Sequence, residues 1–290
     1  ESSAASDVYK RQAQDCESGT CRYHTAPNGT KPHDYFHGPD CCTASGHRII
    51  SLLPTFFYAE NGKDFYINQY LPSRYDGKDF AFEISGNYPE SESMVLTVLS
   101  SKNKNKILNL RIPSWCKAPE VSVNGERVSG IEAGKYLAIT RKWEKGDKIG
   151  ITFPMEGKWI RREHHSKYTT YTLPRGEIMY REEPTDKIPY AFIRGPLVYC
   201  LDMVWNKQLC NDDVNMEKDI RMDTNSEPKW IQKPDTEMLG PVYQTQASYM
   251  GRKVDVLLTP FANIGQWFRP GEEKPYRNAD AFTYAIWLYK

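Results

Sequence analysis

The chain has 290 residues, enough for about two domains of roughly 100–200 residues each. Hydrophobic residues make up 39% and charged residues 26%, with 38 basic and 37 acidic side chains, values typical of a globular protein. The sequence has no basic block and no apolar run of about 20 residues, so we expect neither a nucleic-acid partner nor a membrane span.

The first residues are not typical of a folded segment. Ser2–Gln12 reads as one frame of a transposase adapter used in sequencing libraries, so we interpret residues 1–12 as an artefact and exclude them from fold reasoning. We expect residues 2–12 to lack regular structure and the protein proper to begin near Ala13, downstream of its own start. Its compartment stays open between secreted, periplasmic and cytoplasmic.

A long loop and one helix are predicted next. Residues 13–40 are polar and lack periodicity, which indicates a loop. A dense apolar set follows within Thr43–Tyr58 and predicts a buried helix, with Asp40 or Thr43 as its cap and Pro54 bending or ending it. The apolar set comprises Ile49, Ile50, Leu52, Leu53, Phe56 and Phe57.

Short alternating runs then predict β-strands at roughly ten-residue spacing, a pattern typical of β-sandwiches. The turn signals between them are Asp76-Gly77, Asn124-Gly125 and Lys145-Gly146. The first set of expected strands is Asp64–Leu71, Phe80–Ser85, Met94–Leu99, Ile107–Ile112, Glu120–Val123, Tyr136–Arg141 and Lys148–Phe153. A second set after Gly157 includes Ala191–Ile193, Leu197–Leu201, Val254–Thr259 and Ala281–Leu288, and the polar stretch Asp202–Pro241 is expected to be irregular.

Seven cysteines occur, an odd and widely spaced set that makes a poor disulfide framework. The adjacent pair Cys41-Cys42 directly precedes the predicted helix, whose N-terminus favours thiolate over thiol. Two thiolates there would form half of a tetrahedral zinc site. Three interpretations stay open from the residues alone: buried structural cysteines, a metal or nucleophile role, and a vicinal disulfide.

Other candidates are weaker. Cys16, Cys21 and His24 have a spacing compatible with a zinc knuckle, although scattered polar residues of a loop explain them as well. His37 precedes the cysteine pair by four positions and is a candidate for lining a sugar site. His164-His165 is expected at a solvated surface, and Cys116, Cys200 and Cys210 are expected in the core or at sheet edges. Asn28-Gly29-Thr30 fits a glycosylation sequon.

A series of motifs in fixed order carries a family resemblance over about residues 35–200. The motifs are Gly38–Arg48 with Cys41-Cys42, Phe57–Ala59, Asn68–Pro72, Leu110–Trp115, Val123–Glu126, Lys142-Trp143 with Gly146-Asp147, Phe153–Met155 and Arg194–Tyr199. They resemble glycoside hydrolase family 127, the zinc-thiolate β-L-arabinofuranosidases. Residues 202–290 match the family pattern only loosely.

The resemblance implies an (α/α)₆ barrel catalytic domain followed by two β-sandwich domains, and hence a mainly β fragment. Residues 13–60 would be the end of the barrel, residues 61–155 the first sandwich, and residues 156–290 the second. It further implies a retaining hydrolase acting on β-L-arabinofuranosyl groups of a plant-type glycan. Cys41 would be the nucleophile, and both Cys41 and Cys42 would be Zn²⁺ ligands.

The remaining zinc ligands and the acid/base Glu of the family would lie upstream of this chain, so the fragment is expected to be inactive. A thiolate can replace the nucleophilic carboxylate of a retaining glycosidase, because zinc keeps the sulfur deprotonated. Two alternatives stay open: a related glycosidase of other sugar specificity, and a non-catalytic carbohydrate-binding β-sandwich protein.

Overall fold

The structure is a computed structural model of the whole chain. It describes residues 28–29, 45, 48–49, 51–102, 105–162, 166–172, 178–184, 188–203, 205–209, 219–233, 240–265, 284–286 and 288–290. The chain divides into two compact units. We call His37–Glu156 with Arg194–Leu197 the sandwich unit, and Glu1–Phe36, Gly157–Ile193 and Val198–Lys290 the nine-stranded unit. Residues 2–12 lie outside the described residues, so the expectation for them stays a prediction.

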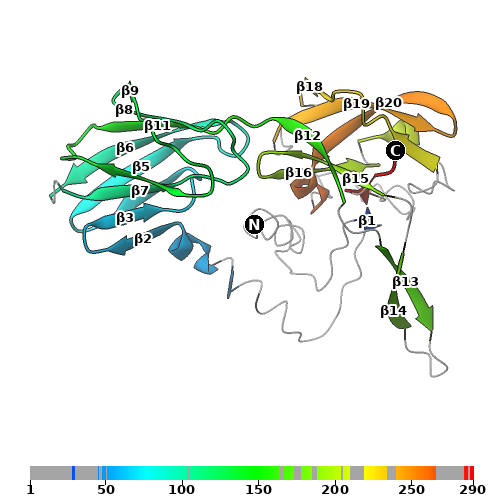
Figure 1. The fold of residues 1–290 in the computed structure, drawn as a ribbon, viewed down its shortest axis with the longest axis horizontal. Coiled ribbons are helices and arrows are strands. Elements are labelled where there is room, and N and C mark those ends of the chain that lie inside the picture. The colour runs from blue at the N-terminus through cyan, green and yellow to red at the C-terminus, as the bar shows by residue number, and fades with distance from the viewer. Residues whose placement is uncertain are drawn as a thin grey trace, which may run out of the picture. The chain divides into compact units, whose positions relative to one another are not determined.

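The sandwich unit consists of two sheets around one apolar core (Figure 1). A four-stranded sheet has the order β10-β7-β3-β2, and a six-stranded sheet has the order β4-β5-β6-β11-β8-β9. The strands are β2 Tyr58–Asn61, β3 Asp64–Ile67, β4 Ser73–Asp76, β5 Phe80–Gly86, β6 Ser93–Ser101, β7 Ile107–Arg111, β8 Glu120–Val123, β9 Glu126–Arg127, β10 Tyr136–Thr140 and β11 Lys148–Thr152. Mainly β structure is thereby confirmed for this part of the chain.

Alternating side chains explain why these segments form a sandwich. In β10, Leu137 and Ile139 are buried while their neighbours are exposed, and β11 buries Ile149 and Ile151 in the same way. A half-buried strand needs this period of two, because successive side chains point to opposite faces. The largest buried side chain of the core is Trp143, and aromatic rings fill much of the remaining volume, including Phe65, Phe80, Phe82 and Phe153.

Turn geometry follows the sequence signals. Asn124-Gly125 joins β8 to β9 with both residues at positive φ, 50° and 89°, as a tight hairpin turn requires. One pairing is parallel: β3 runs parallel to β7, with Asp64 opposite Ile107. The two strands are far apart in sequence, so no hairpin turn dictates their direction.

The nine-stranded unit contains a sheet with the path β1-β21-β16-β20-β19-β17, to which β12, β15 and β18 are added (Figure 1). Its strands are β1 Asn28–Gly29, β12 Gly157–Arg161, β15 Tyr190–Arg194, β16 Leu197–Asp202, β17 Ile220–Met222, β18 Lys229–Ile231, β19 Val242–Tyr249, β20 Arg252–Pro260 and β21 Tyr284–Ala285. A separate hairpin joins β13 Ser166–Thr172 to β14 Ile178–Pro184. Short 3₁₀ turns are η2 Lys207–Leu209 and η3 Phe261–Gly265.

The stretch Asp202–Pro241 is more ordered than expected. It contains β17 and β18, which both pair with β19. Both strands are only three residues long, and such short runs give a weak period-two signal.

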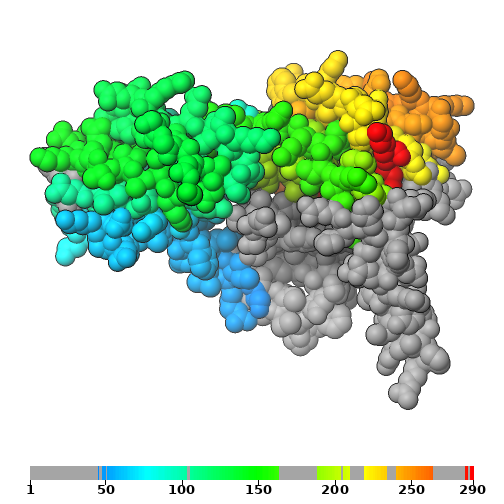
Figure 2. All heavy atoms as spheres, in the orientation of Figure 1, coloured from blue at the N-terminus to red at the C-terminus, as the bar shows by residue number. Residues whose placement is uncertain are grey.

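The expected helix is confirmed at the described residues of this segment, but its expected burial is wrong. Ser45, Arg48, Ile49, Ser51 and Leu52 are helical, and the 3₁₀ turn η1, Leu53–Phe56, follows with a proline in its first positions. However, Leu52 is 50% exposed and Phe56 63% exposed, and Figure 2 shows the segment from residue 51, in blue, at the surface. Apolar periodicity predicts a buried face only when another element packs against that face.

Candidate functional site

The predicted catalytic and zinc-binding residues, Cys41 and Cys42, lie outside the described residues. The same holds for the weaker candidates Cys16, Cys21, His24, His37, His164, His165 and Cys210. Their roles therefore stay predictions. Within the described part of the chain, no group of three or more His, Cys, Asp or Glu residues could hold a metal ion. In that same part, no helix is both long and apolar enough to cross a membrane.

Two other cysteines are described, Cys116 and Cys200; both are free thiols, and both are buried, which agrees with the expected core position. Burial raises the pKa of the Cys116 thiol, which keeps it protonated and unreactive at neutral pH. The Cys200 thiol donates to the carbonyl of Thr259, 3.5 Å away. Both cysteines therefore act as small core residues.

Asn68 anchors the chain segment that follows the cysteine pair. Its backbone N–H donates to the carbonyl of Phe57 at 2.9 Å, and its side-chain Nδ2 donates to the carbonyl of Phe56 at 3.2 Å. Its Oδ1 accepts a hydrogen bond of 2.6 Å from the hydroxyl of Tyr136. One amide side chain thus ties the end of η1 to β3 and β10, and fixes where the segment enters the sandwich.

Two motifs of the resemblance meet at Tyr70. The Tyr70 side chain is 2% exposed, and its hydroxyl donates to the carbonyl of Arg111 at 2.8 Å. Burial raises the pKa of this phenol well above its usual range, so it stays a neutral donor. The motif Asn68–Pro72 is thereby fastened to the end of β7.

Two further motifs meet at Asp147. Its Oδ1 accepts from Asn124 Nδ2 and its Oδ2 from the backbone N–H of Glu144, each at 2.8 Å, while the Arg141 guanidinium lies 3.5 Å away. Burial acts to raise the pKa of the Asp147 carboxyl, but these hydrogen bonds and the Arg141 charge outweigh it and lower the pKa. The ionised Asp147 carboxylate therefore stabilises the turn at Asn124.

A buried lysine closes the end of the four-stranded sheet. The Lys106 side chain is 3% exposed, and its ammonium donates to a Glu60 carboxylate oxygen and to the carbonyl of Gly62 at 3.1 Å. The carbonyl of Lys106 accepts from Trp143 Nε1 at 2.8 Å, which satisfies the only polar group of that buried indole. The lysine has a structural role, because its donors are directed to partners within the fold.

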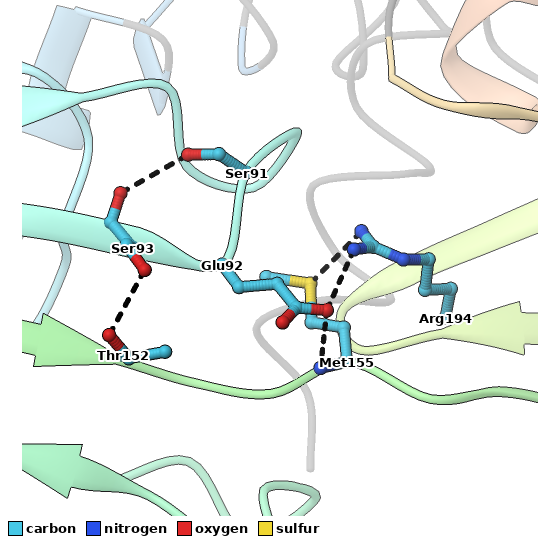
Figure 3. A network of polar contacts seen from close by, with 6 residues as sticks. All are labelled: Ser91, Glu92, Ser93, Thr152, Met155 and Arg194. Carbon is cyan, nitrogen blue, oxygen red and sulfur yellow. Dashed lines mark hydrogen bonds and ion pairs between the residues drawn. The ribbon is translucent and has the colours of Figure 1, made fainter.

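A further polar cluster is centred on Glu92 (Figure 3). Its Oε1 accepts from Arg194 Nη2 and from the backbone N–H of Met155, each at 2.9 Å. Arg194 Nη1 also lies 3.4 Å from the Met155 sulfur, and the Arg194 side chain is only 11% exposed. Next to it, Gly195 has φ +54°, and a Cβ there would come within 2.6 Å of that sulfur. The glycine is needed both for its conformation and for its lack of a side chain.

Sequence reasoning missed Glu92 and Lys106 as members of ion pairs within the fold. Glu92 stands in a polar run between two serines, and its partner Arg194 is 102 positions away. Lys106 likewise looks like a surface residue until the fold brings Glu60 to it. Among the clusters described above, none combines a nucleophile with an acid/base group, so each of them has a structural role in the fold.

Comparisons with known proteins agree with this scaffold. Residues 64–155 match the family described as the beta-L-arabinofuranosidase, GH127 middle domain. The chain is 25% identical over 213 residues to the non-reducing end beta-L-arabinofuranosidase of Bifidobacterium longum subsp. longum, a match that covers 64% of this chain and 29% of the relative. The chain therefore spans less than a third of that relative's length.

Solved structures share the fold. A GH127 beta-arabinofuranosidase superimposes with a TM-score of 0.68 at 23% identity, covering 96% of this chain and 43% of that one. A GH127 beta-L-arabinofuranosidase from Geobacillus stearothermophilus T6 gives a TM-score of 0.63 at 21% identity, covering 96% and 44%. At these identities the likeness concerns the arrangement of the strands, and the chain again spans less than half of each relative.

Proposed function

Because the chain belongs to glycoside hydrolase family 127, we propose that its parent protein is a retaining glycosidase that removes non-reducing-end β-L-arabinofuranosyl groups from a plant-type glycan. The observation that carries the proposal is the matched middle domain at residues 64–155, which directly follows the Cys41-Cys42 segment. The relative from Bifidobacterium longum has this activity in its name.

In this proposal, Cys41 is the nucleophile. Its thiolate attacks the anomeric carbon, so that a carbon–sulfur bond forms while the bond to the leaving oxygen breaks, and a general acid protonates that oxygen. Water, deprotonated by the same group, then attacks the anomeric carbon and releases the thiolate. The acid/base group and its Glu identity come from the family resemblance and would lie upstream of this chain.

Cys41 and Cys42 together would hold Zn²⁺, since two thiolates are a donor set that tetrahedral zinc accepts readily. The ion would keep the sulfur deprotonated at neutral pH. Within the described residues, Asn68 hydrogen-bonds the end of the segment that leads from the cysteine pair into β2. This contact restricts the exit of that segment without contributing to the chemistry.

The test uses the complete parent protein and a covalent arabinofuranosyl inhibitor, followed by peptide mass mapping. We expect the label on Cys41 and about one zinc per chain. Cys41→Ser should abolish turnover, because a hydroxyl is a much weaker nucleophile than a zinc-bound thiolate. Cys42→Ser should lower zinc content and activity together, with partial recovery at high zinc. A label on Cys42 or on a carboxylate would overturn the assignment.

The same labelling and zinc measurements on the parent protein test two rival functions. If the parent protein is a related glycosidase of other specificity, Cys41 should be labelled only by an inhibitor that carries a different sugar. A non-catalytic carbohydrate-binding protein would carry neither label nor zinc. The second rival has one observation in its favour for the fragment alone, because the described residues are dominated by β-sheets.

A further inference from the structure

The outward face of the four-stranded sheet carries an unusual set of side chains. We call it the tyrosine face and define it as Asp64, Tyr66, Asn68, Asn109, Arg111 and Tyr136. Register brings them together, because Tyr66 lies opposite Asn109 on β7, and Tyr136 lies opposite Arg111. Their alternate neighbours, such as Phe65 and Leu108, are buried in the core, so this set faces away from it.

The two tyrosine rings form a fixed aromatic corner. Tyr66 and Tyr136 meet edge to face with centroids 5.3 Å apart, and the Tyr136 hydroxyl is held by Asn68 at 2.6 Å. Tyr136 nevertheless keeps 47% of its surface exposed. An exposed ring that is fixed in orientation costs little entropy when a ligand stacks on it.

Polar groups of planar shape surround this corner. Asn109 Nδ2 donates to Asp64 Oδ1 at 3.1 Å, which orients both side chains, and Asn109 is only 7% exposed. Arg111 is half-buried opposite Tyr136, and among the described residues no carboxylate forms an ion pair with it. Its planar guanidinium is therefore available to donate N–H hydrogen bonds to a ligand.

The charges on the face select an uncharged ligand. The face has one carboxylate and one guanidinium, so it is neutral overall and would not attract a phosphate backbone. Aromatic faces beside a few oriented polar groups are instead what a small hydroxylated ligand requires, since the ring covers its apolar side and the polar groups bind its hydroxyls. We propose that the tyrosine face is a binding site for an arabinofuranosyl-containing glycan.

The choice of sugar rests on the proposed function, but the site itself does not. Binding is tested on the 290-residue chain by isothermal titration with an arabinofuranosyl trisaccharide, and xylotriose serves as the comparison sugar. We expect saturable binding of the first and much weaker binding of the second. Catalysis is not needed for this result, so failure here leaves the cysteine assignment standing, and failure of the Cys41 labelling leaves the binding result standing.

Variants locate the site. Tyr136→Ala should weaken binding roughly tenfold, because the stacking surface is lost, whereas Tyr136→Phe should stay within about twofold, since the ring remains. Arg111→Lys, which keeps the charge and loses the planar fork, should also weaken binding. The matched control is Trp230→Ala, an aromatic residue 66% exposed on the nine-stranded unit, which should leave the affinity unchanged. The proposal is overturned by equal affinity for xylotriose, by unchanged binding in Tyr136→Ala, or by an equal loss in Trp230→Ala.

Discussion

The contact between Glu92 and Arg194 should contribute measurably to stability, although it joins residues far apart in the chain. Glu92 Oε1 accepts two hydrogen bonds of 2.9 Å, from Arg194 and from the backbone N–H of Met155. Hydrogen bonds to charged groups contribute about 1.5–3 kcal/mol each in net terms. The Arg194 side chain is 11% exposed and that of Glu92 36%, so solvent screens the pair only in part.

We therefore expect a coupling free energy of about 1.5 kcal/mol between Glu92 and Arg194 from a double-mutant cycle of Glu92→Ala and Arg194→Ala. The assay is urea unfolding followed by tryptophan fluorescence. The matched control is the ion pair Arg74–Asp76 in the same unit, with nitrogen and oxygen also 2.9 Å apart but side chains 61% and 62% exposed. An exposed pair of this kind should couple by about 0.5 kcal/mol. A Glu92–Arg194 coupling no larger than that of the control would refute the reasoning from burial.

Three further predictions follow from the structure and the family assignment. Asp147 has a lowered pKa, so its contribution to the free energy of unfolding should be complete above about pH 4 and lost as pH falls through that lowered pKa. Asp147→Asn should therefore reduce the fall of the free energy of unfolding at acid pH. An unchanged dependence on pH would contradict this. Gly195→Ala should lower the free energy of unfolding by about 2 kcal/mol or more, because the added Cβ clashes with Met155 and the backbone is left-handed. The control Gly146→Ala, with φ +95° and open space around the Cβ, should lower it by only about 1 kcal/mol. Equal losses of stability in thermal unfolding would argue against the clash. The 290-residue chain should release no measurable L-arabinose from an aryl arabinofuranoside, since the loss of the general acid alone lowers the rate about 10²–10⁴-fold. Detectable release would contradict the expectation that this chain is inactive.

Local patterns predicted much of the sandwich unit. The strand Glu120–Val123 was placed at its observed bounds, because its alternating burial and the adjacent Asn124-Gly125 turn are encoded within a few residues. The short strands β17 and β18 were missed, since three residues carry too little periodicity. Their pairing depends on β19, which lies later in the chain.

Contacts between residues far apart in the sequence could not be predicted from local patterns. The residues near Glu92 and Lys106 in the sequence do not indicate an ion-pair partner, because that partner becomes a neighbour only after the sheets assemble. The exposure of Leu52 and Phe56 shows the converse, since an apolar pattern does not specify what covers it. The prediction of Cys41 and Cys42 rests on motif order and residue chemistry, and the described scaffold neither adds to it nor contradicts it.

The parallel pairing of β3 with β7 has a consequence for how the sandwich unit folds. Hairpins such as β5–β6 close over a few residues, but the contact between Asn109 and Asp64 spans 45 positions. Closing such a loop costs chain entropy before any stabilising contact forms, and folds rich in such pairings reach the native state in milliseconds to seconds rather than microseconds. The strands β4, β5 and β6 can therefore pair early as neighbouring segments. The pairings of β3 with β7 and of β6 with β11 must wait for a strand from far along the chain. Until β7 pairs with it, β3 has an open edge, which is vulnerable to pairing with another chain.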